Sequence, residues 1–141
     1  MAVPRDLREL ERDYLPRVNG QSSTRAYIAL REDEPFGFIQ TYVVMGSGDG
    51  WWEGETDPGA RGIEQFLASA DDLGRGLGSA MVAEFVRLVF LDASVSKVQT
   101  DPSPNNERAI RSYRKAGFKD AGEVVTPDGP ALLMIVHRPK R

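Results

Sequence analysis

Three glycines within five residues constrain this chain most, because they lie between a strand-like segment and a helix-like segment. Residues 61–68 read as a strand, and residues 77–90 carry apolar side chains at helical spacing. Glycines at such a junction let the backbone approach a ligand closely, and the free N–H groups of a helix start attract an anion. We therefore predict a phosphate cradle, with a glycine-rich turn that binds nothing as the plainer alternative. The cradle consists of Leu73, Gly74, Arg75, Gly76, Leu77, Gly78 and Ser79.

The glycine spacing excludes two common phosphate-binding loops. The G-x-x-x-x-G-K-[ST] loop of nucleoside triphosphatases is absent, and the dinucleotide fingerprint G-x-G-x-x-G is replaced by G-x-G-x-G. A nucleotide-binding domain is disfavoured further because no phosphate-binding lysine or magnesium ligand stands next to the glycines.

Length and composition narrow the function classes. The 141 residues predict one domain spanning 1–141, and 18 basic against 21 acidic side chains argue against a general nucleic-acid binder. The absence of cysteine excludes a thiolate nucleophile and a cysteine zinc site, and the single histidine, His137, argues against a Ser-His-Asp triad or a histidine-rich metal site. We expect no metal.

The charge is unevenly distributed. Between residues 49 and 64 there are five acidic side chains and one basic side chain. Such a field attracts a cationic substrate, although a solvated acidic loop explains the same pattern. No segment has the length of a membrane span, and the first nine residues are too charged for a secretory signal. We expect a cytoplasmic protein without a membrane partner.

Periodicity and turn signals predict helices and strands in the order α-β-β-β-α-β-α-β-β. The class is α/β (α+β). The helices are expected at 4–14, 77–90 and from Asn105 or Asn106 to Ala116, and the strands at 26–30, 36–45, 61–68, 95–100, 118–125 and 131–136. Asn105 or Asn106 would cap the third helix, and Gly117 would end it.

Two features of the middle of the chain suggest a site. Both faces of the strand around Glu64 are largely apolar, so this carboxylate is expected to be partly buried, which would raise its pKa toward that of a general base. A strand-edge glutamate that reaches solvent is the alternative. Trp51 and Trp52 are adjacent and cannot both point into one core from an extended segment, so at least one is expected beside a loop or pocket. The alternative is that one tryptophan belongs to the core and the other has no functional role.

The cradle and the segment 106–118 together resemble the GNAT superfamily of acyl-CoA N-acyltransferases. In the segment 106–118, the pattern N-x-x-A-x-x-x-Y, followed by G-F, has its asparagine at Asn106 and its tyrosine at Tyr113. In the cradle, Leu73 stands where the family commonly has Gln or Arg. The resemblance implies a mixed central sheet flanked by helices, with acetyl-CoA as co-substrate and its pyrophosphate on the cradle amides. It also implies that Asn106 touches the pantetheine arm or caps the helix, and that Tyr113 protonates the departing thiolate.

The likeness narrows at the segments 46–53, 56–59, 61–63, 100–104 and 126–130, which look like those of the aminoglycoside 6′-N-acetyltransferases of the resistance type. The resemblance implies that Asp49, Asp101 and Asp128 line a pocket for the ammonium groups of the drug. Trp51 and Trp52 would form its wall. Glu64 stands where these enzymes usually place an aspartate proposed as base or amine ligand.

The chain departs from that family at its start. Its relatives open with a strand and a helix that this sequence lacks, so we expect an exposed sheet edge, which a second copy in a homodimer would cover or which would leave the protein weak or inactive on the drug. Two alternatives to aminoglycoside acetylation therefore stay open. One is a GNAT enzyme for another amine, and the other is a non-catalytic module that binds acyl-CoA or an aminoglycoside.

Overall fold

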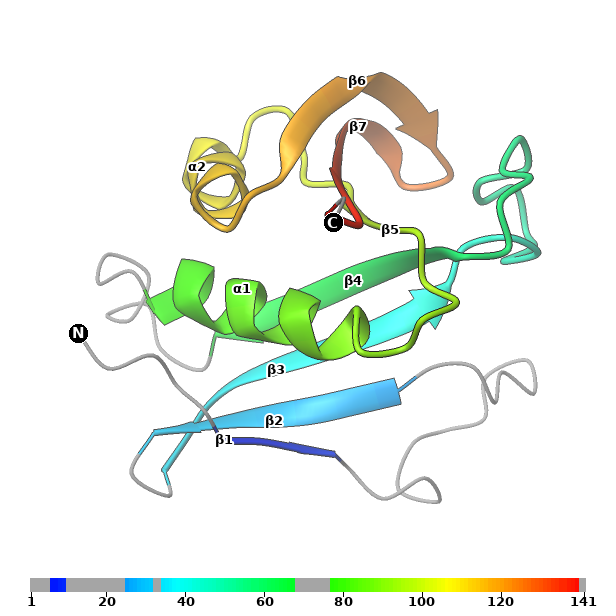
Figure 1. Ribbon diagram of the computed structural model, residues 1–141. Coiled ribbons are helices and arrows are strands. Elements are labelled where there is room, and N and C mark those ends of the chain that lie inside the picture. The colour runs from blue at the N-terminus through cyan, green and yellow to red at the C-terminus, as the bar shows by residue number, and fades with distance from the viewer. Residues whose placement is uncertain (1–5, 10–24, 32–33, 68–76, 140–141) are drawn as a thin grey trace.

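The computed structural model of the chain describes residues 6–9, 25–31, 34–67 and 77–139. These residues form one seven-stranded sheet and two helices (Figure 1). In chain order the elements are β1 (Asp6–Glu9), β2 (Arg25–Arg31), β3 (Glu34–Val43), β4 (Ala60–Leu67), α1 (Leu77–Val89), β5 (Lys97–Thr100), α2 (Glu107–Lys115), β6 (Lys119–Thr126) and β7 (Gly129–His137).

The start of the chain differs from the expectation. A helix was expected over 4–14, but β1 is a strand that pairs antiparallel with β2, with Leu7 opposite Ala29. The helical spacing of a few apolar residues is a weak signal, and the open edge of β2 offers backbone hydrogen bonds that a short helix cannot match. The rest of the expected helix lies outside the described residues. The other expected elements are confirmed, with ends that differ by at most two residues.

The sheet is mixed, in the order β1-β2-β3-β4-β5-β7-β6. All neighbouring strands are antiparallel except β4 and β5, which run parallel and are joined through α1. A parallel pair needs such a crossover, whereas β6 and β7 are joined by the tight turn predicted at 126–130.

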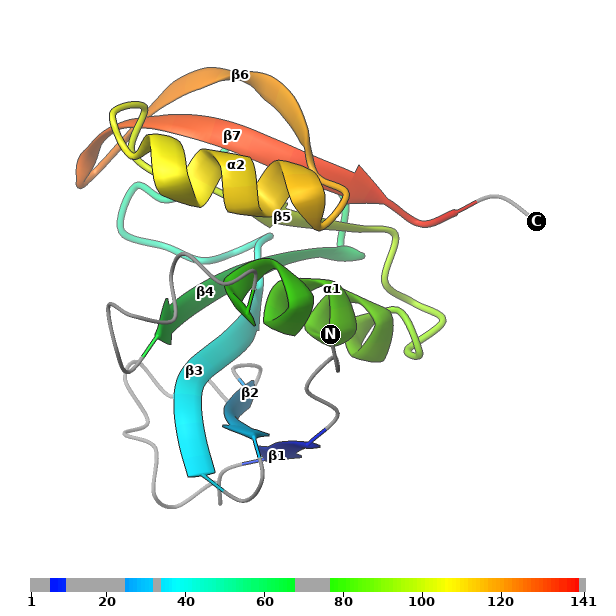
Figure 2. The same ribbon diagram turned by 90° about the vertical axis from the view of Figure 1, so that its left-hand side faces the viewer.

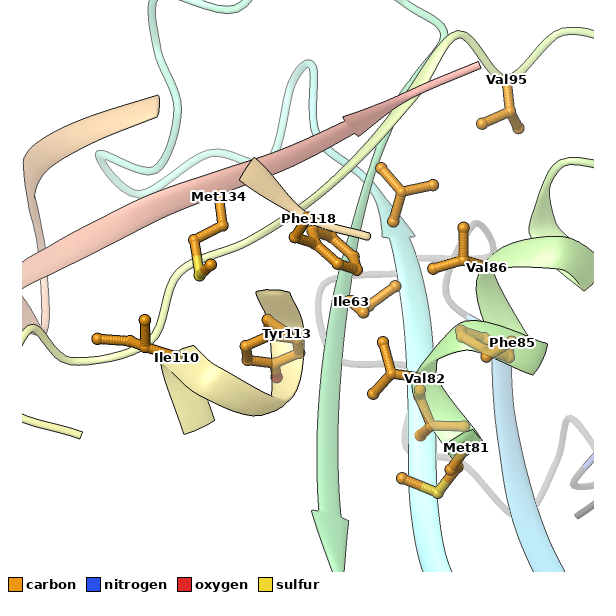
Figure 3. Close-up of a cluster of buried hydrophobic side chains, with 12 residues drawn as sticks. Ile63, Met81, Val82, Phe85, Val86, Val95, Ile110, Tyr113, Phe118 and Met134 are labelled. Carbon is orange, nitrogen blue, oxygen red and sulfur yellow. The ribbon is translucent and has the colours of Figure 1, made fainter. Parts of the chain in front are cut away.

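Both helices pack on one face of the sheet (Figure 2). Met81, Val82 and Phe85 of α1 are fully buried, and they share one core with Ile39 of β3 and Ile63 of β4. Figure 3 shows this cluster extending to side chains of α2 and β7. The helix-bearing face therefore carries the main hydrophobic core. Neither of the two described helices is long and apolar enough to cross a membrane.

The ends of α2 follow the sequence signals. Asn106 is the N-cap, and its side chain accepts a 3.1 Å hydrogen bond from the backbone N–H of Ala109. Gly117 follows the helix with a φ of +107°, a conformation that glycine adopts without strain. Both capping predictions are confirmed, and they set where α2 meets the sheet.

Candidate functional site

The sheet opens between β4 and β5. Their parallel pairing covers three positions and ends at Gly62 opposite Gln99, whereas β4 continues to Leu67. In Figure 1 the two strands begin close together and then diverge toward the first turn of α1. A gap in the backbone pairing therefore lies at the centre of the sheet, where a ligand can take the place of a strand.

The backbone of Gln65 faces this gap. The carbonyl of Ala60 accepts from Val44 toward β3, and the carbonyl of Gly59 accepts from Ser96 toward β5. The backbone N–H and C=O groups of successive strand residues point alternately to the two neighbouring strands, so those of Gln65, like those of Gly59, point toward β5. Within the described ranges no β5 residue is in register with Gln65. An N–H group in this position can bond a ligand amide or polarise a carbonyl.

The start of α1 lies where the gap widens (Figure 1). Leu77, Gly78 and Ser79 of the predicted cradle open this helix, and its first turn carries no acidic residue. The positive end of the helix dipole therefore favours an anion, as a pyrophosphate site requires. Leu73, Gly74, Arg75 and Gly76 lie outside the described residues.

Even-numbered residues of β4 face away from the helices. Ile63 is buried in the helix-side core, so Gly62 and Glu64 lie on the opposite face. The start of α1 and Glu64 thus belong to opposite faces, and the gap between β4 and β5 lies between them. This arrangement lets two reactants meet from the two sides of one sheet.

Two of the predicted acidic residues act on a third. Burial, followed by the negative charges of Glu64 and Asp128, raises the pKa of Asp101 to about 6. Within the described part of the chain none of the three carboxylates forms an ion pair. A half-buried carboxylate surrounded by like charges attracts a cation, which relieves the repulsion.

Glu64 itself differs from the expectation. Partial burial was predicted, but its side chain is exposed, because it lies on the face of β4 that the two described helices leave uncovered. Its Oε1 accepts a 2.6 Å hydrogen bond from Nε2 of Gln40, the residue directly opposite on β3. The Glu64 carboxylate is therefore exposed and fixed by one hydrogen bond. The alternative expectation, a glutamate that reaches solvent, describes it better than burial does.

An aromatic wall stands beside the acidic residues. The ring of Tyr42 lies over Gly62, where an added Cβ would come within 2.2 Å of it, so only glycine fits there. Nε1 of Trp52 donates to the Tyr42 hydroxyl at 3.3 Å, and the ring centroids of Trp51 and Trp52 are 6.0 Å apart. Burial and the charge of Asp101 raise the pKa of Tyr42 above its ordinary value. Trp52 is thereby linked to the acidic site through Tyr42.

The loop that carries Asp49 lies against the turn that carries Asp128. A Cβ at Gly50 would be 3.5 Å from Cγ of Pro127, which places the two loops in contact. Asp49 is exposed with a φ of +55°. The fold therefore brings the two loops together at the same end of the sheet.

Tyr113 reaches the gap from the helix side. Its ring is buried beside Phe118, at a centroid distance of 5.5 Å (Figure 3). Burial raises the pKa of its hydroxyl, while hydrogen bonds from Thr100 and Gln65 act in the opposite direction. The hydroxyl thus stays protonated at neutral pH and lies between the ends of β4 and β5, as a proton donor at the gap must.

Three residues of this site were not predicted from the sequence: Gln40, Tyr42 and Gln65. Each is an ordinary strand residue without a motif. The two-residue period places Gln40 and Tyr42 on one face of β3, but only the register with β4 brings them to Glu64 and Gly62.

Within the described ranges no group of His, Asp and Glu side chains could hold a metal ion.

A sheet that opens between two parallel strands, with a helix start on one face and carboxylates on the other, has the form of an acyl-CoA-dependent acyltransferase. Residues 4–126 match the acetyltransferase (GNAT) domain, and the chain belongs to this family. Both the family and the mixed sheet flanked by helices are thereby confirmed.

Relatives and solved structures are close to this chain. It is 56% identical over 132 residues to aminoglycoside N(6′)-acetyltransferase type 1 of Klebsiella pneumoniae, a match that covers 94% of this chain and 66% of that protein. It is 60% identical over 88 residues to a kanamycin resistance protein of Rhizobium radiobacter, covering 62% of this chain and 82% of that protein. The structure of AAC(6′)-Ib with coenzyme A and kanamycin has a TM-score of 0.84 and 58% identity, covering 89% of this chain and 73% of that one.

Proposed function

We propose that this domain transfers the acetyl group of acetyl-CoA to a primary amine of an aminoglycoside, at the 6′ position. One observation carries the proposal: Glu64, Asp101 and Asp128 form a carboxylate cluster, without ion pairs among the described residues, beside the gap in the sheet. A polycationic amine is the ligand that such a cluster favours. The relatives named above support the choice of aminoglycoside, and the chain spans 66% of the length of the first of them.

The residues on the helix face would hold the acetyl donor. The amides of Leu73–Ser79 would bind its pyrophosphate, and Asn106, at the start of α2, would stand near its pantetheine arm. The backbone of Gln65 would pair with that arm inside the gap and polarise the thioester carbonyl. The donor supplies the activated acetyl group.

The residues on the opposite face would hold the acceptor. Asp49, Asp101 and Asp128 would bind ammonium groups, and Trp51 and Trp52 would form the wall of the pocket. Glu64, directly or through a water, would take the proton that the reacting ammonium must lose before its nitrogen can attack. The acceptor nitrogen and the thioester would then approach each other from the two sides of the gap.

The transfer needs no covalent enzyme intermediate. The amine nitrogen forms a bond to the acetyl carbon, the carbon–sulfur bond breaks, and the thiolate takes a proton from Tyr113. Because burial raises the pKa of Tyr113, its hydroxyl carries that proton at neutral pH. The nitrogen loses a second proton as the amide forms, which balances the proton that Tyr113 gives up, and the first proton, taken by Glu64, passes to solvent.

Thiol release from acetyl-CoA in the presence of kanamycin tests the proposal directly. We expect turnover that requires both substrates and that falls strongly in Glu64→Gln, while acetyl-CoA binding by that variant stays close to wild type. A panel of polyamines and peptide amines serves as the comparison. Turnover with those amines but not with kanamycin would move the activity to another acceptor, and calorimetric binding without any turnover would indicate a binding module.

A further inference from the structure

Gln40 and Glu64 form a direct cross-strand pair on the open face of the sheet. They are opposite each other in the β3–β4 register, and Nε2 of Gln40 donates to Oε1 of Glu64 at 2.6 Å. Within the described residues this is the only side-chain hydrogen bond recorded for Glu64. One carboxylate oxygen is therefore held, and Oε2 has no hydrogen-bond partner in the part of the chain that the structure describes.

The surroundings explain why Glu64 needs a partner. Its side chain is exposed and has several rotatable bonds, so fixing one orientation costs conformational entropy. The charge of Glu64 acts on the nearby Asp101, and two like charges repel each other. A single strong hydrogen bond to an ionised acceptor is of the right size to oppose both effects.

The neutrality of Gln40 matters as much as its reach. A lysine or arginine at this position would pair with Glu64 and cancel the field that attracts an ammonium group. An amide donates a hydrogen bond and leaves the net charge of the cluster unchanged. Gln40 therefore orients the carboxylate without neutralising it.

We infer that Gln40 is a positioning residue for the acetyl transfer: it holds Oε1 of Glu64 so that Oε2 faces the reacting amine. The inference rests on the proposed function, because it assigns Gln40 a role in that reaction through Glu64. Gln40 is rigidly placed by the β3–β4 ladder, which gives the carboxylate a fixed anchor.

The test is Gln40→Leu, measured by thiol release with kanamycin and acetyl-CoA. We expect kcat to fall about tenfold, the size of one lost charge-assisted hydrogen bond, with KM for acetyl-CoA unchanged. In a Glu64→Gln background, Gln40→Leu should cause no further loss, because it acts only through the carboxylate. Equal losses in both backgrounds, or an unchanged kcat, would overturn the inference.

Thr41→Val is the matched control. Thr41 is the next residue on β3, it points to the helix face, and its buried hydroxyl has no partner among the described residues. The substitution keeps the shape and should leave kcat at the wild-type value. A comparable loss in this control would show that kcat responds to any change in β3.

A second measurement is independent of turnover. The side-chain amide protons of Gln40, observed by NMR in the wild type, should be shifted downfield by the hydrogen bond and should move upfield in Glu64→Gln. Wild-type protein that releases no thiol with kanamycin would refute the proposed function only. An amide signal that does not respond to Glu64→Gln would refute the positioning role.

Discussion

Asp101→Asn should stabilise the free protein at neutral pH. In the folded chain the pKa of Asp101 is raised from 3.8 to about 6, first by burial and then by the charges of Glu64 and Asp128. A carboxyl with a raised folded pKa binds more protons in the native state than in the unfolded state. Its charge therefore destabilises the fold above pH 6, and the penalty disappears as the pH falls toward 4.

The pKa difference sets the size of the effect. The interval between 3.8 and about 6 corresponds to about 3 kcal/mol in the free energy of unfolding. Asp101 is only half-buried, and solvent screening reduces this to roughly 1 to 2 kcal/mol. The amide of Asn is nearly isosteric and carries no charge, so the variant should recover that amount at pH 7.5. The melting temperature should rise by about 3 to 8 °C.

Urea unfolding followed by tryptophan fluorescence at pH 7.5, 6 and 5 measures the difference. The gain of Asp101→Asn over wild type should be largest at pH 7.5 and should shrink steadily toward pH 5. Asp120→Asn is the control, because Arg114 holds the pKa of Asp120 below its ordinary value, and this change should give no stabilisation. A gain that is independent of pH, or a loss at pH 7.5, would refute the electrostatic reasoning.

The same substitution has a functional counterpart. If the penalty on Asp101 serves to attract an ammonium group, the variant should be more stable and bind kanamycin less tightly. Calorimetry should show an affinity loss of about tenfold at low salt that becomes smaller as the salt concentration rises. Unchanged affinity would separate Asp101 from the acceptor site.

Three further changes follow from single contacts. Gly62→Ala should displace the Tyr42 ring, because the added methyl group would overlap it, and should lower the melting temperature and raise KM for kanamycin. An unchanged melting temperature and KM would mean that the ring moves aside without cost. Arg138→Ala should lower the free energy of unfolding in urea by about 1 to 3 kcal/mol, because the Arg138 guanidinium donates to three backbone carbonyls that follow α1. A loss below about 0.5 kcal/mol would contradict this. Asn106→Ala should cost about 1 kcal/mol, measured the same way against Asn105→Ala, through loss of the cap on Ala109.

Much of the local structure could be predicted from the sequence. Helical spacing located α1, and a cap residue with a following glycine set the ends of α2. The first expected helix was wrong over β1, because its weak periodicity competed with the open edge of β2, which lies far away in sequence. Predictions from local sequence patterns were correct where no strand distant in sequence offered the segment a better set of hydrogen bonds.

The candidate site could be predicted only in part. Asp49, Asp101 and Asp128 were expected to line one pocket, with Glu64 in a separate role, and the structure adds that the charges of Glu64 and Asp128 raise the pKa of Asp101. The burial expected for Glu64 was wrong, because a run of apolar residues does not say which face of a strand the helices will cover. The parts of the cradle before α1 lie outside the described residues.

By itself the sequence determined the class of the fold, the family and the types of residue at the site. These depend on short spacings, such as the glycines 74, 76 and 78 beside a helix start, which act through neighbouring backbone groups. Only the tertiary structure decided that Gln40 bonds Glu64, that Tyr42 covers Gly62, and that β4 and β5 part after three paired positions. Register and strand divergence depend on packing between segments far apart in the chain, and no local pattern encodes them.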